Sequence, residues 1–285
     1  MFKVAGADFS SIETDSRKIT RSALFVALAG DKFDGHDFIL ATLKAGASGV
    51  ICRADWSGLK EAQAGFPNAK FICVKDPLTE YREIAKAWRK NFKFPVVAVA
   101  GSVGKTTTKE MLAAILAGKY PSVLKTTGSQ NGFVGIPMTL LLLRPSHQAA
   151  VIEVGIDEPG TMTGHMDTVS ADIAVLPAIG PEHLEKLVDV ATVAREEAAA
   201  LEWIAAHRGT AVVRLDDEWI APLANKLNGE KVITCGMNVD ADCSGKFEND
   251  TLTVDFSGKA EKFPIPLPGE HNASNLLVAI SVAHA

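Results

Sequence analysis

A glycine-rich stretch between Ala98 and Met111, AVAGSVGKTTTKEM, holds the residue types that bind phosphate. The usual Walker pattern has a glycine at the position where Val99 stands, so this loop is shorter and begins at Gly101. Glycines let backbone N–H groups close around phosphate oxygens, and the start of the next helix adds partial positive charge. The pattern predicts a nucleotide-binding loop that comprises Gly101, Ser102, Gly104, Lys105, Thr106 and Thr107.

Two side chains of this loop have distinct predicted roles. Lys105 would reach the terminal phosphates of a nucleotide, and the hydroxyl of Thr106 would bind Mg²⁺. A tight turn with a solvent-facing lysine is the alternative. It is the weaker one, because the preceding run VVAVA predicts a buried strand, and strand, loop and helix in this order are the context of a phosphate loop.

Glu153 and His183 belong to the ends of two further apolar strand patterns, AVIEVG and IAVLPAIG. In an open parallel sheet the carboxyl ends of the strands border the ligand crevice, so both side chains are expected beside the phosphates. A carboxylate and an imidazole there would hold magnesium between nucleotide and substrate. Spacing alone leaves open a helix-capping or ion-paired Glu153 and a loop histidine at His183.

The composition excludes several classes of protein. The 285 residues are 47% hydrophobic and 22% charged, which is typical of a folded globular chain. The net charge of -5 argues against nucleic-acid partners, and no apolar stretch approaches the roughly 20 residues that span a bilayer. The cysteines show neither a CxxC pair nor dense spacing, so we expect a reducing, cytoplasmic location.

Apolar runs alternate with helical patterns along the whole chain, which predicts an α/β protein of two domains. Residues 1–92 are the expected small N-terminal α/β domain, and KFP at 93–95 is the expected linker. The second domain, residues 93–285, is expected to surround the phosphate loop with a mostly parallel sheet flanked by helices. The segment KFENDTLTVDFSG predicts a hairpin attached to that sheet.

The short loop and the later motifs TTGSQNGFVGIPMTLLLL, VIEVG, IGPEHLE and GEHNASN resemble those of the Mur ligase family, ATP-dependent ligases of peptidoglycan-precursor synthesis. Near the start, TDSRKI and LFVALAGDKFDGHDFI resemble the UDP-sugar-binding domain of the member that adds D-alanyl-D-alanine to UDP-N-acetylmuramoyl-tripeptide. The resemblance extends over nearly the whole chain. It implies these two substrates, the cofactors ATP and Mg²⁺, and an amide bond formed through an acyl phosphate.

The resemblance also implies site residues in the second domain. Lys105 would grip the γ-phosphate, and His183 would help to hold a second metal ion. Asn131 in SQNGFVGIP lies where the family has a polar residue near the phosphates, and three residues of GEHNASN resemble adenine or ribose contacts, namely His271, Asn272 and Asn275.

At the UDP end, Ser16 and Arg17 lie on a match to the uridine-nucleotide site, as do Gly35 and His36. Loop structure is the alternative for this group, because DGHD also makes a good turn. Family members have a third, C-terminal domain that helps to bind the nucleotide and the incoming amino compound, and no match to it follows Ala285. We therefore expect that this chain does not ligate D-alanyl-D-alanine by itself. We also expect a monomer.

Glu197 departs from the family pattern. Helical spacing in VDVATVAREEAAALEWI puts it on the same face as Val193, Leu201 and Ile204, where a carboxylate needs a partner. Near this position the family usually has a lysine carbamylated by carbon dioxide, and Glu197 would supply a catalytic carboxylate directly. Glu196 takes this part if the alignment shifts by one residue, and a structural ion pair with a lysine or arginine is the alternative.

Two other functions stay open. One is a non-catalytic module that binds UDP-muropeptide or nucleotide without forming a bond. The other is a carboxylate–amine ligase of the same superfamily that acts on folate or polyamino acids, which DGHDFI and the separate N-terminal domain disfavour.

Overall fold

The structure is a computed structural model that describes residues 1–30, 32–156, 158–227, 231–265 and 267–285. Within this part the chain divides into two compact units, residues 1–88 and 89–285. Helix α3 (Pro77–Arg89) ends at the first residue of the second unit, and the predicted linker at 93–95 follows it.

The first unit is a small α/β domain. Its parallel sheet has the strand order β3-β4-β5-β6, and a short antiparallel hairpin, β1-β2, precedes it. All three residues of β4 are buried, which is why this strand is a continuous apolar run, Leu-Phe-Val. The strands are β1 (Phe2–Val4), β2 (Ala7–Phe9), β3 (Ile12–Glu13), β4 (Leu24–Val26), β5 (Gly49–Arg53) and β6 (Lys70–Val74). The helices are the 3₁₀ turns η1 (Ser16–Lys18) and η2 (Gly35–Phe38), α1 (Ile39–Lys44) and α2 (Leu59–Gly65).

The second unit contains one large sheet with the strand order β15-β14-β13-β12-β11-β10-β7-β9-β8. From β8 to β13 neighbouring strands run parallel, and β13, β14 and β15 run antiparallel. The strands are β7 (Val96–Val99), β8 (Val123–Lys125), β9 (Ala149–Glu153), β10 (Ile173–Val175), β11 (Thr210–Arg214), β12 (Lys231–Met237), β13 (Cys243–Glu248), β14 (Thr251–Phe256) and β15 (Lys259–Pro264).

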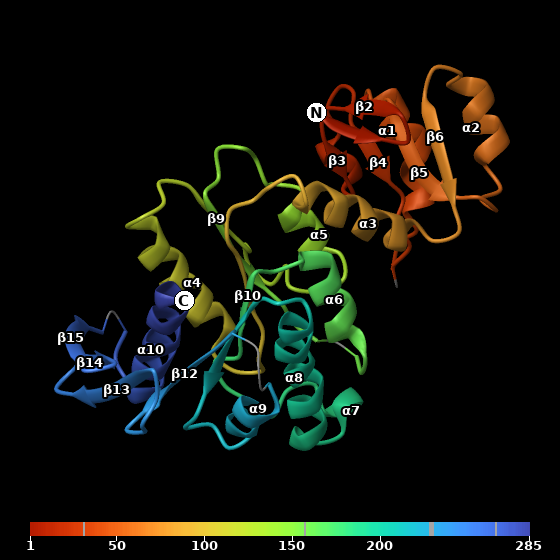
Figure 1. Ribbon diagram of the computed structural model, residues 1–285. Coiled ribbons are helices and arrows are strands. Elements are labelled where there is room, and N and C mark those ends of the chain that lie inside the picture. The colour runs from red at the N-terminus through yellow and green to blue at the C-terminus, as the bar shows by residue number, and fades with distance from the viewer. Residues whose placement is uncertain (31, 157, 228–230, 266) are drawn as a thin grey trace. The chain divides into compact units, whose positions relative to one another are not determined.

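Helices cover both faces of this sheet (Figure 1). On one face α4 (Lys105–Ala117) packs against α10 (Glu270–His284), and their apolar side chains form a core with the strands. On the other face α5 (Gly135–Leu140) packs against α6 (Thr161–Val169), and α6 packs against α8 (Val190–Ala206). The short helices α7 (Leu184–Leu187) and α9 (Ala221–Lys226) contact α8 and β11, respectively. The predicted α/β class with a helix-flanked, mostly parallel sheet is confirmed.

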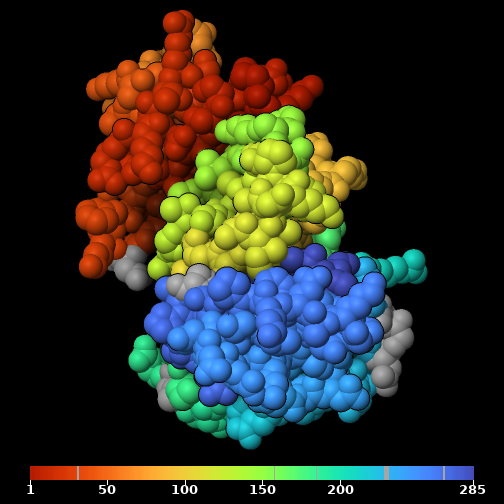
Figure 2. All heavy atoms as spheres, turned by 90° about the vertical axis from the view of Figure 1, so that its left-hand side faces the viewer, coloured from red at the N-terminus to blue at the C-terminus, as the bar shows by residue number. Residues whose placement is uncertain are grey.

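The predicted hairpin is confirmed as β13 and β14. The chain turns at Asn249 and Asp250, which have φ of 49° and 56°. Left-handed backbone at both central residues is the geometry of the tight turns that suit a twisted hairpin. In Figure 2 the blue segments from β12 to α10 form one continuous surface beside the yellow segment that carries α4. None of the described helices combines the length and apolar character that a membrane crossing needs.

Candidate nucleotide-binding site

The phosphate loop connects the central strand β7 to helix α4, as predicted. Gly101 and Gly104 have φ of +94° and +84°, a region that glycine enters without strain. Gly104 also has a close neighbour, because a Cβ atom built there would lie 2.5 Å from the Asn275 side-chain oxygen. Both glycines are therefore required by the backbone conformation, and Gly104 by packing as well.

Polar contacts hold the first half of the loop in place. The N–H groups of Ser102 and Val103 both donate to the carbonyl oxygen of Ala178, at 3.1 and 3.2 Å. The hydroxyl of Ser102 accepts the N–H of Gly180 at 2.6 Å. Helix α4 begins at Lys105, so the N–H groups of its first turn have no acceptor within the helix and are available to an anion.

A pocket of about 340 Å³ opens at this helix start. Strand register explains its position: Glu153 at the end of β9 lies opposite Val99 at the end of β7. The carboxyl ends of these parallel strands border the pocket, as expected for this class of sheet. Its lining residues are Ser102, Gly104, Lys105, Thr106, Thr107, Ser129, Asn131, Glu153 and Glu182.

Lys105 is nearly buried, and its ammonium group forms an ion pair with Glu182. The Nζ atom lies 2.8 Å from Oε1 and 3.1 Å from Oε2 of this carboxylate. The carbonyl oxygen of Ser102 is a more distant acceptor at 3.5 Å. The cation that is predicted to hold phosphate is therefore held by a carboxylate in this structure.

The carboxylate of Glu153 is only 2% exposed and has a partner on each oxygen. Thr106 donates its hydroxyl hydrogen to Oε2 at 3.0 Å, and Asn131 donates from Nδ2 to Oε1 at 2.9 Å. The backbone N–H of Glu153 donates to the hydroxyl of Thr126 at 2.9 Å. Thr106, Asn131 and Glu153, predicted from separate motifs, thus meet in one cluster.

Lys109 supplies the positive charge beside this cluster. It is 1% exposed, and its Nζ atom lies 3.3 Å from Oε2 of Glu153 and 3.3 Å from Oε1 of Glu110. Glu110 also pairs with Lys125. A chain of alternating charges therefore leads from the buried Glu153 to the surface.

Glu197 is fully buried, as its place on the apolar face of α8 predicts. Its Oε2 atom accepts the N–H of Gly101 at 2.6 Å, so its hydrogen-bond partner is a backbone amide rather than a lysine or arginine. Within the described chain Oε1 has no hydrogen-bond partner. Burial raises the pKa of Glu197 to about 7, and the attraction of Lys105 and the Gly101 hydrogen bond oppose this rise. Glu196 instead accepts the N–H of Gly160 at 2.6 Å.

His183 follows Glu182 and has a left-handed backbone with φ of 49°. Its side chain is 42% exposed, and its Nε2 atom lies 4.0 Å from Oε1 of Glu182. In the described ranges no three His, Cys, Asp or Glu side chains are grouped so that they could hold a metal ion. The structure therefore does not bring His183 and Glu197 into a preformed second metal site.

The three candidates from GEHNASN lie at the start of α10, and none of them lines the phosphate pocket. Asn275 is buried, and its Oδ1 atom accepts the Thr108 hydroxyl at 3.5 Å. Asn272 donates from Nδ2 to the carbonyl oxygen of Pro268 at 2.8 Å, and His271 is exposed. Of these residues, Asn275 contacts the phosphate-loop helix.

The first two UDP-site candidates lie in the turn η1. Asp15 accepts the N–H of Arg17 at 3.0 Å, and two hydrogen bonds of 2.9 and 2.8 Å join its carboxylate to the Arg17 guanidinium. These bonds hold the pKa of Asp15 well below its usual range. The Arg17 side chain is nevertheless 86% exposed, and Ser16 is half-buried, so both remain accessible to a ligand.

The other two candidates, Gly35 and His36, lie in the turn η2. A Cβ atom at Gly35 would lie 2.7 Å from backbone atoms of Leu28, so only glycine fits. The buried His36 uses both ring nitrogens: Nδ1 lies 2.5 Å from Asp34 Oδ1, and Nε2 accepts the N–H of Arg53 at 2.9 Å. This pattern assigns the proton to Nδ1. The imidazole therefore positions the turn, and ligand contacts there would come from the backbone.

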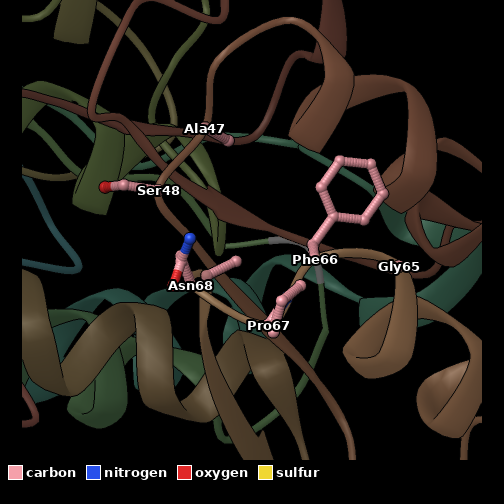
Figure 3. A pocket seen from close by; sticks show the side chains of 7 residues that line it. Ala47, Ser48, Gly65, Phe66, Pro67 and Asn68 are labelled. Atoms are coloured by element: carbon pink, nitrogen blue, oxygen red, sulfur yellow. The ribbon is translucent and has the colours of Figure 1, made fainter.

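The first unit also has a pocket of about 320 Å³ (Figure 3). Ser48, Phe66, Pro67 and Asn68 are among the residues that line it. None of the four UDP-site candidates belongs to its lining. The predicted uridine contacts and this pocket are therefore separate features of the unit.

Two charged residues of the site escaped the sequence prediction. Lys109 lies four residues after Lys105 on α4, and this helical spacing places both on one face, which is a signal that was present. Glu182 directly precedes His183 in a loop, where no periodic pattern shows the direction of a side chain. Its contact with Lys105 depends on the path of the loop after β10.

A glycine-rich loop between a buried parallel strand and a helix, with a lysine, a threonine and a buried carboxylate around one pocket, defines a phosphate-loop nucleotide-binding protein. The Mur ligase middle domain model matches residues 99–283, and the model of the Mur ligase family catalytic domain matches residues 8–120. The chain therefore belongs to the Mur ligase family.

Individual relatives agree with this assignment. The UDP-N-acetylmuramoyl-tripeptide–D-alanyl-D-alanine ligase of Synechocystis sp. is 35% identical over 277 residues, which are 96% of this chain and 58% of that protein. The enzyme of the same name from Bacillus subtilis is 32% identical over 95% of this chain and 57% of its own length. A crystal structure of MurF from Acinetobacter baumannii superimposes with a TM-score of 0.86 at 26% identity, over 99% of this chain and 61% of that one. The chain thus spans about three fifths of these relatives.

Proposed function

We propose that this protein takes part in peptidoglycan-precursor synthesis as a ligase that joins a carboxylate to an amine with consumption of ATP. Its proposed substrates are UDP-N-acetylmuramoyl-tripeptide and D-alanyl-D-alanine, the molecules that give the Synechocystis and Bacillus enzymes their name. The observation that carries the proposal is the meeting of Lys105, Thr106 and Glu153 around one pocket in a chain of this family.

In the proposed reaction the terminal phosphoryl group moves from ATP to an oxygen of the tripeptide carboxylate, and ADP leaves. The amine nitrogen of D-alanyl-D-alanine then attacks the acyl carbon, loses a proton and displaces phosphate, which leaves an amide bond. Catalysis of such steps consists mainly of positioning and of neutralising charge on the phosphates. Lys105 and the first-turn N–H groups of α4 would carry out this neutralisation.

The donor set around Thr106 and Glu153 fits Mg²⁺, which prefers carboxylate and hydroxyl oxygens together with phosphate oxygens and water. When bound there, Mg²⁺ would neutralise phosphate charge. His183 and Glu197 remain proposed supports of a second ion, in which the buried carboxylate replaces a carbamylated lysine. The Thr106 and Asn131 contacts of Glu153 hold the carboxylate of this first position in place.

In the first unit we propose that the turns η1 and η2 contact the UDP part of the muropeptide. The exposed guanidinium of Arg17 is suited to a bidentate phosphate contact once it leaves Asp15. Ser16 and the backbone at Gly35 and His36 would complete the contact. In the second unit, Asn131 is proposed beside the phosphates, and His271, Asn272 and Asn275 are proposed near adenosine.

Titration calorimetry of the whole chain with ATP and Mg²⁺, and separately with UDP-N-acetylmuramoyl-tripeptide, tests the proposal. Wild type should bind both ligands. Lys105→Ala should weaken ATP binding by at least tenfold, since loss of a buried charged partner commonly costs about 2 to 5 kcal/mol. The same variant should bind the muropeptide as wild type does.

Lys119→Ala, which removes an exposed lysine just after α4, serves as the control. It should leave both affinities unchanged. Equal ATP affinity of wild type and Lys105→Ala would contradict the nucleotide site. Binding of ATP without any binding of the muropeptide would contradict the proposed substrate. A full-length form that binds both ligands without turnover would favour a non-catalytic module.

A further inference from the structure

The phosphate pocket has an unusual distribution of charge. Among the described residues that line it, Lys105 is the only lysine or arginine, and it faces the carboxylate of Glu182. Glu153 is the second carboxylate in this lining. The polyphosphate of a nucleotide would therefore meet two carboxylates beside the lysine that is placed to attract it.

Glu182 holds Lys105 firmly. Both carboxylate oxygens lie within 3.1 Å of Nζ, and the Lys105 side chain is 8% exposed, so little solvent competes for this ammonium group. The Glu182 side chain is 21% exposed and lines the pocket. The carboxylate thus lies on the pocket side of the pair, where a phosphate group would have to approach.

We infer that Glu182 is a counter-ion that takes the place of phosphate: it positions Lys105 before a nucleotide binds, and the arriving phosphate must displace it. A carboxylate resembles phosphate as an acceptor, since both are anionic and take hydrogen bonds from lysine. Glu182 thereby sets the affinity of the site for the nucleotide. This inference rests on the proposed nucleotide-binding function.

The contact with Glu182 keeps Lys105 in position before a nucleotide binds. An ammonium group that is nearly buried needs a partner, because an unpaired buried charge is costly. Glu182 supplies that partner before the ligand arrives, at the cost of competing with it afterwards. Apart from His183, whose Nε2 atom lies 4.0 Å away, Lys105 is the one ion-pair partner of Glu182 among the described residues, so an arriving phosphate has a single close ion pair to displace.

Titration of Glu182→Gln with ATP in the presence of EDTA tests this inference, because without metal no turnover complicates the measurement. Gln keeps the size of the side chain and removes the charge. It should bind ATP about tenfold more tightly than wild type, since Lys105 no longer has to leave an anion. Glu182→Asp keeps the charge and should bind close to wild type, and Glu185→Gln, an exposed carboxylate on α7, should not change the affinity.

The possible outcomes separate this inference from the proposed function. Wild type that binds ATP while Glu182→Gln binds it equally or more weakly would overturn the counter-ion alone. A Gln variant that weakens binding only when Mg²⁺ is present would instead assign Glu182 to the metal, and would also overturn it. If neither protein binds ATP, in EDTA or with Mg²⁺, while both unfold at the same temperature, the nucleotide-binding function fails and the counter-ion with it.

Discussion

Glu197 and Gly101 form a hydrogen bond of 2.6 Å between a buried carboxylate and the first amide of the phosphate loop, although 96 residues separate them in the chain. This contact ties helix α8 to the loop that follows β7. Because burial raises the pKa of Glu197 to about 7, the charge of this group changes close to neutral pH. The hydrogen bond that the Gly101 amide donates therefore goes to a group whose charge depends on pH.

The stability of the protein should record this titration. The carboxyl group has an ordinary pKa of 4.5 and a folded pKa of about 7, so its contribution is fully present below about pH 4.5 and is lost as the pH rises to about 7. Glu197→Gln removes the ionisable carboxyl group, so its stability lacks this pH dependence. Denaturant unfolding between pH 4.5 and 7.5 should show wild type losing about 3 kcal/mol relative to the variant, at about 1.4 kcal/mol per pH unit. A constant difference across this range would contradict the raised pKa.

Carbon dioxide should have no role in the activity of this protein. The resemblance to the family implies a lysine that needs carbamylation near the position of Glu197, whereas a glutamate has its carboxylate already. Magnesium-dependent ligation by a full-length form should therefore be the same in bicarbonate and in degassed buffer. Stimulation by bicarbonate, or a Glu197→Gln variant as active as wild type, would show that Glu197 does not replace the carbamate.

Lys109→Met should destabilise the protein strongly. The substitution keeps much of the volume but leaves Glu153 without its nearest cation, and breaking a buried ion pair typically costs about 3 to 5 kcal/mol. Thermal unfolding would measure the loss. The exposed Lys119→Met should unfold as wild type does, and equal melting temperatures of all three proteins would show that Lys109 is not needed to compensate Glu153.

Gly104→Ala should impair nucleotide binding without removing any polar group. The new Cβ atom would lie 2.5 Å from Asn275 Oδ1 in a backbone with φ of +84°, so the loop or α10 must shift. Pairing it with Asn275→Ala separates the clash with Asn275 from the strained backbone, and Asn275→Ala alone is the reference because Asn275 is itself proposed near adenosine. The double variant should recover part of the lost affinity if the contact matters, and none if the backbone conformation is the whole cause; calorimetry with ATP distinguishes these results.

Local patterns predicted the fold and the centre of the site. The run before Gly101 is a buried strand, and the register of β7 with β9 places Glu153 beside the loop, as a parallel sheet requires. Contacts between distant segments were not predictable in this way. The partner of Lys105 depends on the path of residues 177–182, and that path depends on the carbonyl oxygen of Ala178 accepting two loop amides. Helical spacing indicated that Glu197 is buried but not that it binds Gly101.

The packing of α10 on α4 has a consequence for how the protein is made. Asn275 contacts Gly104, and the apolar face of α10 completes the core beneath the phosphate loop. A ribosome that has synthesised residues up to β15 has produced every loop residue that is proposed to touch phosphate, yet not the helix that supports them. We therefore expect the nascent chain to complete its nucleotide site only when α10 docks, and a chaperone or protease that meets the chain earlier to encounter an uncovered part of this sheet face.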